Sequence, residues 1–200
     1  KEVEEEMTEA GIEITKDLTI PKLFVKQCRK YGKNKVAMRE KEFGIWIPFT
    51  WQDYYDNVKY LTLGMVSLGL KPGDKVAMIG DNRPEGLWAE MAALCAGGVA
   101  VWLFQDCMMD EVKYIIDHSD TKVFVGETQE EVDKALSIRD ECPKMEWILW
   151  DDPKGMRNYH QDYLMSLKKV QDLGRELDQK EPELFENLVA KGTGDDVCLL

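Results

Sequence analysis

Polar side chains follow four apolar runs of the sequence, at the points where a parallel sheet would bind a ligand. The segments are Gly80-Asp81-Asn82-Arg83, Phe104-Gln105-Asp106, Gly126-Glu127-Thr128 and Asp151-Asp152. Open α/β sheets bind ligands outside the carboxyl ends of their strands. A phosphate at such an edge needs close backbone N–H groups and a free helix N-terminus. Asp81 and Glu85 would repel a phosphate, and we expect these two carboxylates to cap the helix that follows.

The other motifs that could carry chemistry favour structural roles. Gly192-Thr193-Gly194 is half of a dinucleotide-binding motif, but it follows an expected helix and is therefore expected to be a turn. His118, beside Asp117, is expected at a helix end, where the dipole favours a cation. His160 lies in a loop without a nearby serine or cysteine. We therefore assign no catalytic, cofactor-binding or metal-ligating residue to this sequence.

The cysteines and the apolar runs indicate the cellular setting. Five cysteines are widely spaced without a C-x-x-C pair, so neither a disulfide framework nor a zinc site is expected. A reducing, cytoplasmic setting is expected. The acidic first residues lack the apolar segment of a signal peptide. The longest apolar run, Met91 to Leu103, falls short of the ~20 residues that a membrane span needs, so an integral membrane protein is not expected.

Alternating strand and helix patterns predict an α/β fold with a doubly wound, mainly parallel sheet and helices on both faces. The expected strands are Val76–Ile79, Val99–Phe104, Val123–Val125 and Trp147–Trp150. The expected helices between them are Glu85–Ala96, Asp110–Ser119 and a helix opened by the capping-box spacing of Thr128 to Glu131. In the first of these helices, Leu87, Met91 and Leu94 are expected to line the buried face.

Four regions are expected along the chain. Residues 1–18 form a polar leader, and residues 19–70 form a helix, a hairpin and an amphipathic helix opened by the Thr50–Asp53 capping box. Residues 71–152 form the parallel α/β core. Residues 153–200 form a loop, helices and the start of a strand. Because the chain ends in an apolar run, we expect it to be a truncated piece of a larger protein.

Composition excludes one class of partner. The chain has 26 Lys and Arg residues against 38 Asp and Glu residues, a net charge of −12. Phosphate binding along a nucleic acid needs clustered cations, so a nucleic-acid partner is not expected.

An ordered set of motifs resembles the N-terminal region of the adenylate-forming (AMP-binding) acyl-CoA synthetases. The motifs are Thr50-Trp51, Pro72-Gly73-Asp74-Lys75-Val76-Ala77, Asn82-Arg83-Pro84-Glu85 and Ala96-Gly97-Gly98-Val99-Ala100-Val101. Phe104–Cys107, Glu111–Ile115 and Glu127–Lys134 are most similar to the long-chain fatty acid–CoA ligase branch. Gly86, Ala100 and Cys107 depart from that pattern, which leaves the branch and the acyl chain length open.

The resemblance implies a parent enzyme that activates a carboxylic acid, with a fatty acid as the expected substrate. Such an enzyme uses ATP and Mg²⁺ to form an acyl-adenylate, releases pyrophosphate and transfers the acyl group to coenzyme A. Its phosphate loop, magnesium-binding glutamate and C-terminal lysine would follow Leu200. The 200-residue chain is therefore expected to be inactive alone and to bind none of these cofactors.

Two alternatives remain open at the level of sequence. One is another adenylate former, such as a carboxylic acid reductase or an aryl-acid ligase. The other is a stand-alone flavodoxin-like binding module without chemistry. Peripheral membrane association and a homodimer are also left open.

Overall fold

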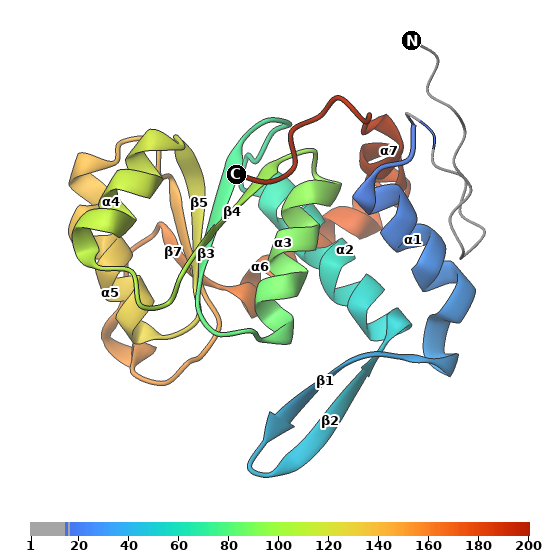
Figure 1. The fold of residues 1–200 in the computed structure, drawn as a ribbon, viewed down its shortest axis with the longest axis horizontal. Coiled ribbons are helices and arrows are strands. Elements are labelled where there is room, and N and C mark those ends of the chain that lie inside the picture. The colour runs from blue at the N-terminus through green and yellow to red at the C-terminus, as the bar shows by residue number, and fades with distance from the viewer. Residues whose placement is uncertain (1–14, 16) are drawn as a thin grey trace.

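The computed structural model describes residue 15 and residues 17–200 (Figure 1). The predicted polar leader, residues 1–18, therefore lies mostly outside the described residues. The short 3₁₀ turns of the chain are Gly32–Asn34, Arg139–Glu141 and Met156–Asn158.

A five-stranded parallel sheet forms the centre of the fold. Its strands are β3 (Lys75–Ile79), β4 (Val99–Leu103), β5 (Thr121–Gly126), β6 (Trp147–Trp150) and β7 (Leu164–Ser166). They are ordered β4-β3-β5-β6-β7, and each neighbouring pair is parallel. The predicted parallel sheet with crossover helices is thus confirmed, with one more strand than the sequence pattern indicates.

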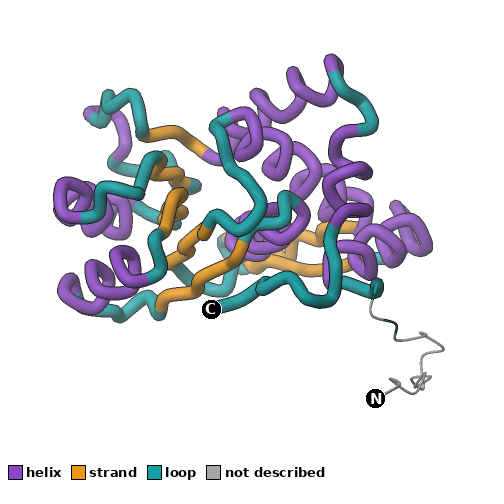
Figure 2. Tube along the Cα trace, turned by 90° about the horizontal axis from the view of Figure 1, so that it is seen from above, coloured by secondary structure: helices purple, strands orange, loops and turns teal. Residues whose placement is uncertain are grey.

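Helices cover both faces of this sheet (Figures 1 and 2). Alternate residues of β3 point to opposite faces, because side chains alternate along a strand. Val76 and Met78 join the core formed with α1 (Ile20–Tyr31), α2 (Trp51–Ser67), α3 (Pro84–Cys95), α6 (Leu167–Lys180) and α7 (Leu184–Lys191). Ala77 and Ile79 join the second core, under α4 (Met109–His118) and α5 (Gln129–Ile138). The sheet therefore separates two hydrophobic cores.

The hairpin of β1 (Val36–Glu42) and β2 (Ile45–Thr50) connects α1 to α2. The predicted capping box at the start of α2 is present. The Thr50 hydroxyl accepts a hydrogen bond from the Asp53 backbone N–H at 3.2 Å, and the Asp53 carboxylate accepts one from the Thr50 N–H at 2.7 Å. These bonds satisfy two backbone donors that the helix start would otherwise leave free.

Three sequence predictions about this core are wrong. The sequence predicts only a loop and helices after residue 152 until the start of a strand at the end of the chain, but Leu164–Ser166 forms β7, because β6 supplies a hydrogen-bonding partner. Phe104 lies beyond the end of β4 and is 86% exposed. Leu87 is 42% exposed, because the face of α3 that packs on the sheet carries Trp88, Ala92 and Cys95 at helical spacing.

The last residues of the chain lie beside β4. The Ala100 N–H donates to the Cys198 carbonyl at 2.8 Å, and the Leu200 N–H donates to the Ala100 carbonyl at 3.0 Å. Ala100 and Leu199 form a parallel bridge. Residues 198–200 thus extend the sheet at its β4 edge.

Candidate functional site

The carboxyl ends of β3, β5 and β6 meet the start of α3 at a small pocket of about 20 Å³. Gly80, Gly126 and Trp102 line its apolar part. The sequence predicted that the polar residues at these strand ends would gather at one edge, and the structure brings Asp81, Glu127 and Asp151 together there. This edge is the candidate site, because ligands of open α/β sheets bind outside it.

Arg83 is the cation at the centre of this edge. Its Nε lies 3.1 Å from Glu127 Oε1 and 3.5 Å from Glu40 Oε1, which comes from the β1 strand of the hairpin. The other oxygen of Glu127 accepts a 2.6 Å hydrogen bond from the Asp81 N–H. The carboxylates of Glu40 and Glu127 therefore neutralise the Arg83 guanidinium. The Asp81 N–H, another hydrogen-bond donor at this edge, is already bonded to Glu127.

The prediction that Asp81 and Glu85 cap α3 is wrong. The N-cap position belongs to Arg83, and no side chain makes a capping hydrogen bond there. Pro84 occupies the first turn and has no N–H to satisfy. The helix start thus needs one fewer capping acceptor, which leaves Asp81 free to join the edge.

Two carboxyl groups at this edge are held close to their neutral form. Burial raises the pKa of Glu85 to about 7, and the nearby Asp151 raises it further. Burial also raises the pKa of Asp151 to about 6, although Arg83 opposes this shift. One carboxylate oxygen of Glu85 is buried without a hydrogen-bond partner. The edge therefore accepts protons readily near neutral pH and offers hydrogen-bond acceptors in excess of donors.

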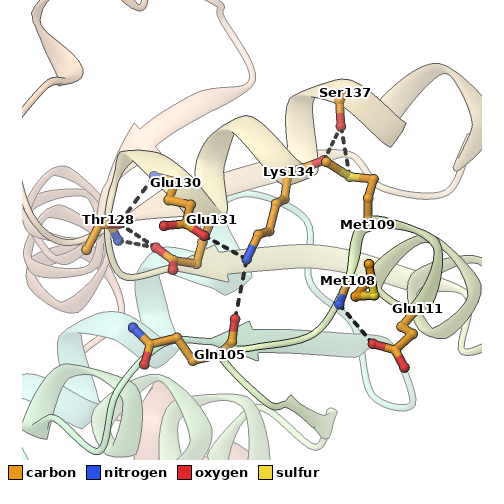
Figure 3. Close-up of polar contacts among 9 residues, drawn as sticks. All are labelled: Gln105, Met108, Met109, Glu111, Thr128, Glu130, Glu131, Lys134 and Ser137. Atoms are coloured by element: carbon orange, nitrogen blue, oxygen red, sulfur yellow. Dashed lines mark hydrogen bonds and ion pairs between the residues drawn. The ribbon is translucent and has the colours of Figure 1, made fainter.

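The motifs that resemble the long-chain ligase branch hold the adjacent loop and helices together (Figure 3). The Thr128 N–H and hydroxyl both donate to the buried Glu131 carboxylate, at 2.9 and 2.6 Å, which confirms the predicted capping box of α5. Lys134 Nζ lies 3.1 Å from the Glu130 carboxylate and 3.3 Å from the Gln105 carbonyl oxygen. This lysine ties α5 to the loop after β4.

A second set of contacts in the same close-up fixes α4. The Met108 N–H donates to the Glu111 carboxylate at 2.8 Å. The Ser137 hydroxyl contacts the Lys134 carbonyl oxygen at 2.7 Å and the Met109 sulfur at 3.1 Å. In this chain the motif residues therefore position loops and helices at the carboxyl edge.

The remaining candidate residues lie apart from the edge pocket. His118 ends α4 as predicted, and its ring stacks on Tyr114 with centroids 5.3 Å apart. The predicted turn after α7 spans Thr193 to Asp196, where the Asp196 N–H donates to the Thr193 carbonyl oxygen at 3.2 Å. The five cysteines are free, and burial raises the pKa of Cys28 to about 12, so its thiol is not an activated nucleophile.

The described part of the chain holds no cluster of three or more His, Cys, Asp or Glu side chains suited to a metal ion. Within residues 15 and 17–200, no helix has the length and hydropathy of a membrane span. The assignment of no catalytic residue to this chain stays a prediction. What sequence reasoning missed is Glu40, because no local signal shows that β1 would reach the end of β5.

Known proteins resemble this chain along most of its length. The long-chain-fatty-acid–CoA ligase ACSBG2 of Xenopus laevis is 25% identical over 185 residues, which are 92% of this chain and 24% of that protein. The 4-hydroxybutyrate–CoA ligase 2 of Metallosphaera sedula is 34% identical over 133 residues, which are 66% of this chain and 23% of that protein. The chain thus spans about a quarter of the length of these relatives.

Solved structures share the fold. The anthranilate CoA ligase AuaEII, in complex with anthranoyl-AMP, aligns with a TM-score of 0.68 at 16% identity, over 80% of this chain and 29% of that one. The adenylation domain of a carboxylic acid reductase from Segniliparus rugosus, with AMP and a co-purified carboxylic acid, aligns with a TM-score of 0.68 at 16% identity over 80% of this chain and 31% of that one. A sequence model of the AMP-binding enzyme family matches residues 24–190. The chain therefore belongs to the AMP-binding enzyme family.

Proposed function

We propose that this chain is part of an acyl-CoA ligase that uses ATP to activate a carboxylic acid and then transfers the acyl group to coenzyme A. The observation that carries this proposal is the family match over residues 24–190, joined to CoA ligases that align with up to 93% of the chain. A carboxylate is a poor electrophile, and adenylation gives it a leaving group that a thiol can displace. A fatty acid is the proposed substrate class.

The edge pocket does not fit a magnesium-bound triphosphate. Its cation, Arg83, is paired with Glu40 and Glu127, and its other charged groups are carboxylates. Stabilising the charge on the phosphates of ATP while the adenylyl group is transferred and pyrophosphate leaves needs cations and free N–H donors. We therefore assign this chain the role of a scaffold, and we assign the binding of ATP and Mg²⁺ to other parts of the enzyme.

The proposed cellular location follows from the proposed fatty acid substrate. We place the enzyme in the cytoplasm in peripheral contact with a membrane, where fatty acids partition. A homodimer is the second proposed partner. Neither proposal depends on the pocket at the sheet edge.

ATP–pyrophosphate exchange tests the function. The 200-residue chain and a longer polypeptide that contains it are assayed side by side with short, medium and long fatty acids and with aryl acids. We expect exchange by the longer protein with fatty acids and none by the chain alone. Exchange by the chain above a no-enzyme blank would contradict the scaffold role. Exchange only with aryl acids would replace the fatty acid proposal, and silence with every acid would favour a binding module.

A further inference from the structure

The β1–β2 hairpin projects from the body of the molecule (Figure 1). Three apolar side chains at its turn are exposed. Phe43 is 97% exposed, Ile45 70% and Trp46 61%. We call these three residues the hairpin tip. Scattered exposed apolar residues are common, but three adjacent ones on a protruding loop indicate an interaction site.

The backbone at the tip presents Phe43 at a conformational cost. Phe43 and Gly44 connect the two strands with φ angles of +46° and +81°. Two-residue hairpin turns of this kind favour Asn-Gly or Asp-Gly, because both central residues need positive φ. A bulky side chain is strained there, and such strain concentrates at functional positions. The strain is therefore a second observation that points to the tip.

The base of the hairpin is fixed to the body. Glu40 pairs with Arg83 at the edge of the parallel sheet. The rings of Phe49 and Trp88 contact each other edge to face, with centroids 5.4 Å apart. The Trp51 N–H donates to the carbonyl oxygen of Lys35 at 3.1 Å. The tip is thus held at a set orientation relative to the sheet.

One face of the hairpin is basic, although the whole chain has a net charge of −12. The hairpin, residues 36–50, carries two cations, Arg39 and Lys41, and two glutamates, Glu40 and Glu42, at alternating positions of β1. Lys41 lies directly opposite Trp46 in the strand register, with Nζ 5.8 Å from the ring centroid. Because side chains alternate along a strand, Arg39 shares this face with Lys41. A basic and aromatic face therefore leads to the apolar tip.

We propose that the hairpin tip inserts into the headgroup region of an anionic lipid bilayer. Aromatic and branched apolar side chains partition to that region, and lysine and arginine beside them bind anionic headgroups. The acidic body is repelled by the same surface, so attraction is confined to the hairpin face that carries Arg39 and Lys41, and it orients the molecule. This inference rests on the membrane contact proposed above and does not require ligase activity.

Two other binding partners of the hairpin would give different experimental results. The outer edges of this two-stranded sheet could add a strand from another polypeptide segment, and two copies of the chain could pair through their tips. The membrane is favoured because three exposed apolar side chains are adjacent at the turn, whereas the part of β1 that leads to the turn, residues 39–42, is charged at every position.

Vesicle cosedimentation tests the proposal. The chain is mixed with vesicles of phosphatidylcholine, alone or with phosphatidylserine. We expect binding to the anionic vesicles that weakens with salt, and at least tenfold weaker partitioning for the double variant Phe43→Ser/Ile45→Ser. Leu87→Ser/Tyr114→Ser, which removes exposed apolar side chains elsewhere, is the matched control and should bind as the wild type does.

Two double variants that each remove two cations test the electrostatic contribution to membrane binding. Each cation near an anionic leaflet contributes a factor of about five to partitioning, so Arg39→Gln/Lys41→Gln should weaken binding roughly 25-fold. Lys154→Gln/Arg157→Gln, at exposed positions away from the hairpin, should change it little. Circular dichroism verifies that each variant is folded.

Three results would overturn the proposal. The first is no binding of the wild-type chain to anionic vesicles, and the second is equal binding by the tip variant. The third is binding by the chain that disappears in the longer polypeptide, which would assign the tip to a contact within the protein. A concentration-dependent dimer that the tip variant abolishes, without vesicle binding, would assign it to a second copy. Pyrophosphate exchange by the longer polypeptide, measured on the same variants and expected unchanged, reports separately on the ligase proposal.

Discussion

Substituting Gly174 by alanine should destabilise the fold, although the same change stabilises most helices. Gly174 lies in the middle of α6, buried where this helix crosses α2. A Cβ at this position would lie against the carbonyl oxygen of Tyr60, 2.8 Å from the carbon of that carbonyl and 2.9 Å from the backbone nitrogen of Gly64. Gly64 in turn faces the carbonyl group of Val170. The two glycines therefore let the two backbones touch.

The size of the effect follows from the nature of these neighbours. Non-bonded carbon contacts are comfortable near ~3.5 Å, so the helices must separate by about 0.7 Å or more. Backbone atoms cannot rotate away as a side chain can, so the strain should reach the upper part of the usual overpacking range, about 3 kcal/mol. Alanine returns about 1 kcal/mol through its higher helix propensity. We expect a net loss of about 2 kcal/mol in the free energy of unfolding.

Urea denaturation followed by circular dichroism measures this loss for Gly174→Ala and for wild type. Glu176→Ala is the matched control on the same helix, because Glu176 is exposed and its substitution should cost under about 0.5 kcal/mol. A Gly174→Ala protein as stable as wild type, or more stable, would show that the helices do not cross at this glycine.

Three further changes test the site and its supports. Glu85→Gln should stabilise the fold by about 1 kcal/mol at pH 8, after allowance for partial exposure, because the folded pKa of about 7 exceeds the unfolded value of 4.5 and the carboxyl opposes folding increasingly as the pH rises from about 4.5 to 7. The gain should vanish in melts below about pH 4.5, and a gain independent of pH would refute the assignment. Leu94→Ala should cost about 2–5 kcal/mol in denaturant melts, because Leu94 is 6% exposed, and a loss under ~1 kcal/mol would make its site peripheral. Thr128→Ala should cost about 1 kcal/mol by removing the α5 cap, whereas Thr128→Ser should keep most of that stability.

Most of the sheet could be predicted because each of its predicted strands is recognisable from a short stretch of sequence. Each predicted strand is a run rich in valine, isoleucine or tryptophan, bounded by chain long enough for a crossover helix. β7 escaped prediction because three residues, Leu164–Ser166, carry no periodicity of their own, and their strand conformation depends on pairing with β6. The exposure of Leu87 escaped prediction because α3 is apolar on several sides, so the sequence does not indicate which side meets the sheet.

The contacts at the edge of the sheet also include some that the sequence predicts and some that it does not. The gathering of Asp81, Glu127 and Asp151 could be predicted, because carboxyl ends of parallel strands meet at one edge. The pairing of Arg83 with Glu40 could not, since it depends on how the hairpin folds back against α3. The glycines within α2 and α6 likewise do not indicate a close contact between helices, because in the sequence they only weaken the helix prediction. Their role is visible once the two helices are placed side by side.

Arg83 links the edge of the sheet to the hairpin. This link explains the carboxylate of Glu127 at the edge, because Arg83 pairs with it as well as with Glu40. An arginine next to a pocket is suited to bind a phosphate, but here one guanidinium holds Glu127 after β5 and Glu40 on β1. A nucleotide phosphate bound by Arg83 would compete with both carboxylates and remove one of the contacts that fix the base of the hairpin to the body. Because Glu127 also accepts the Asp81 N–H, the competition would cost the loop after β3 its support as well. The contacts of Arg83 that oppose phosphate binding at this edge therefore also help to hold the hairpin, whose tip is the proposed membrane contact.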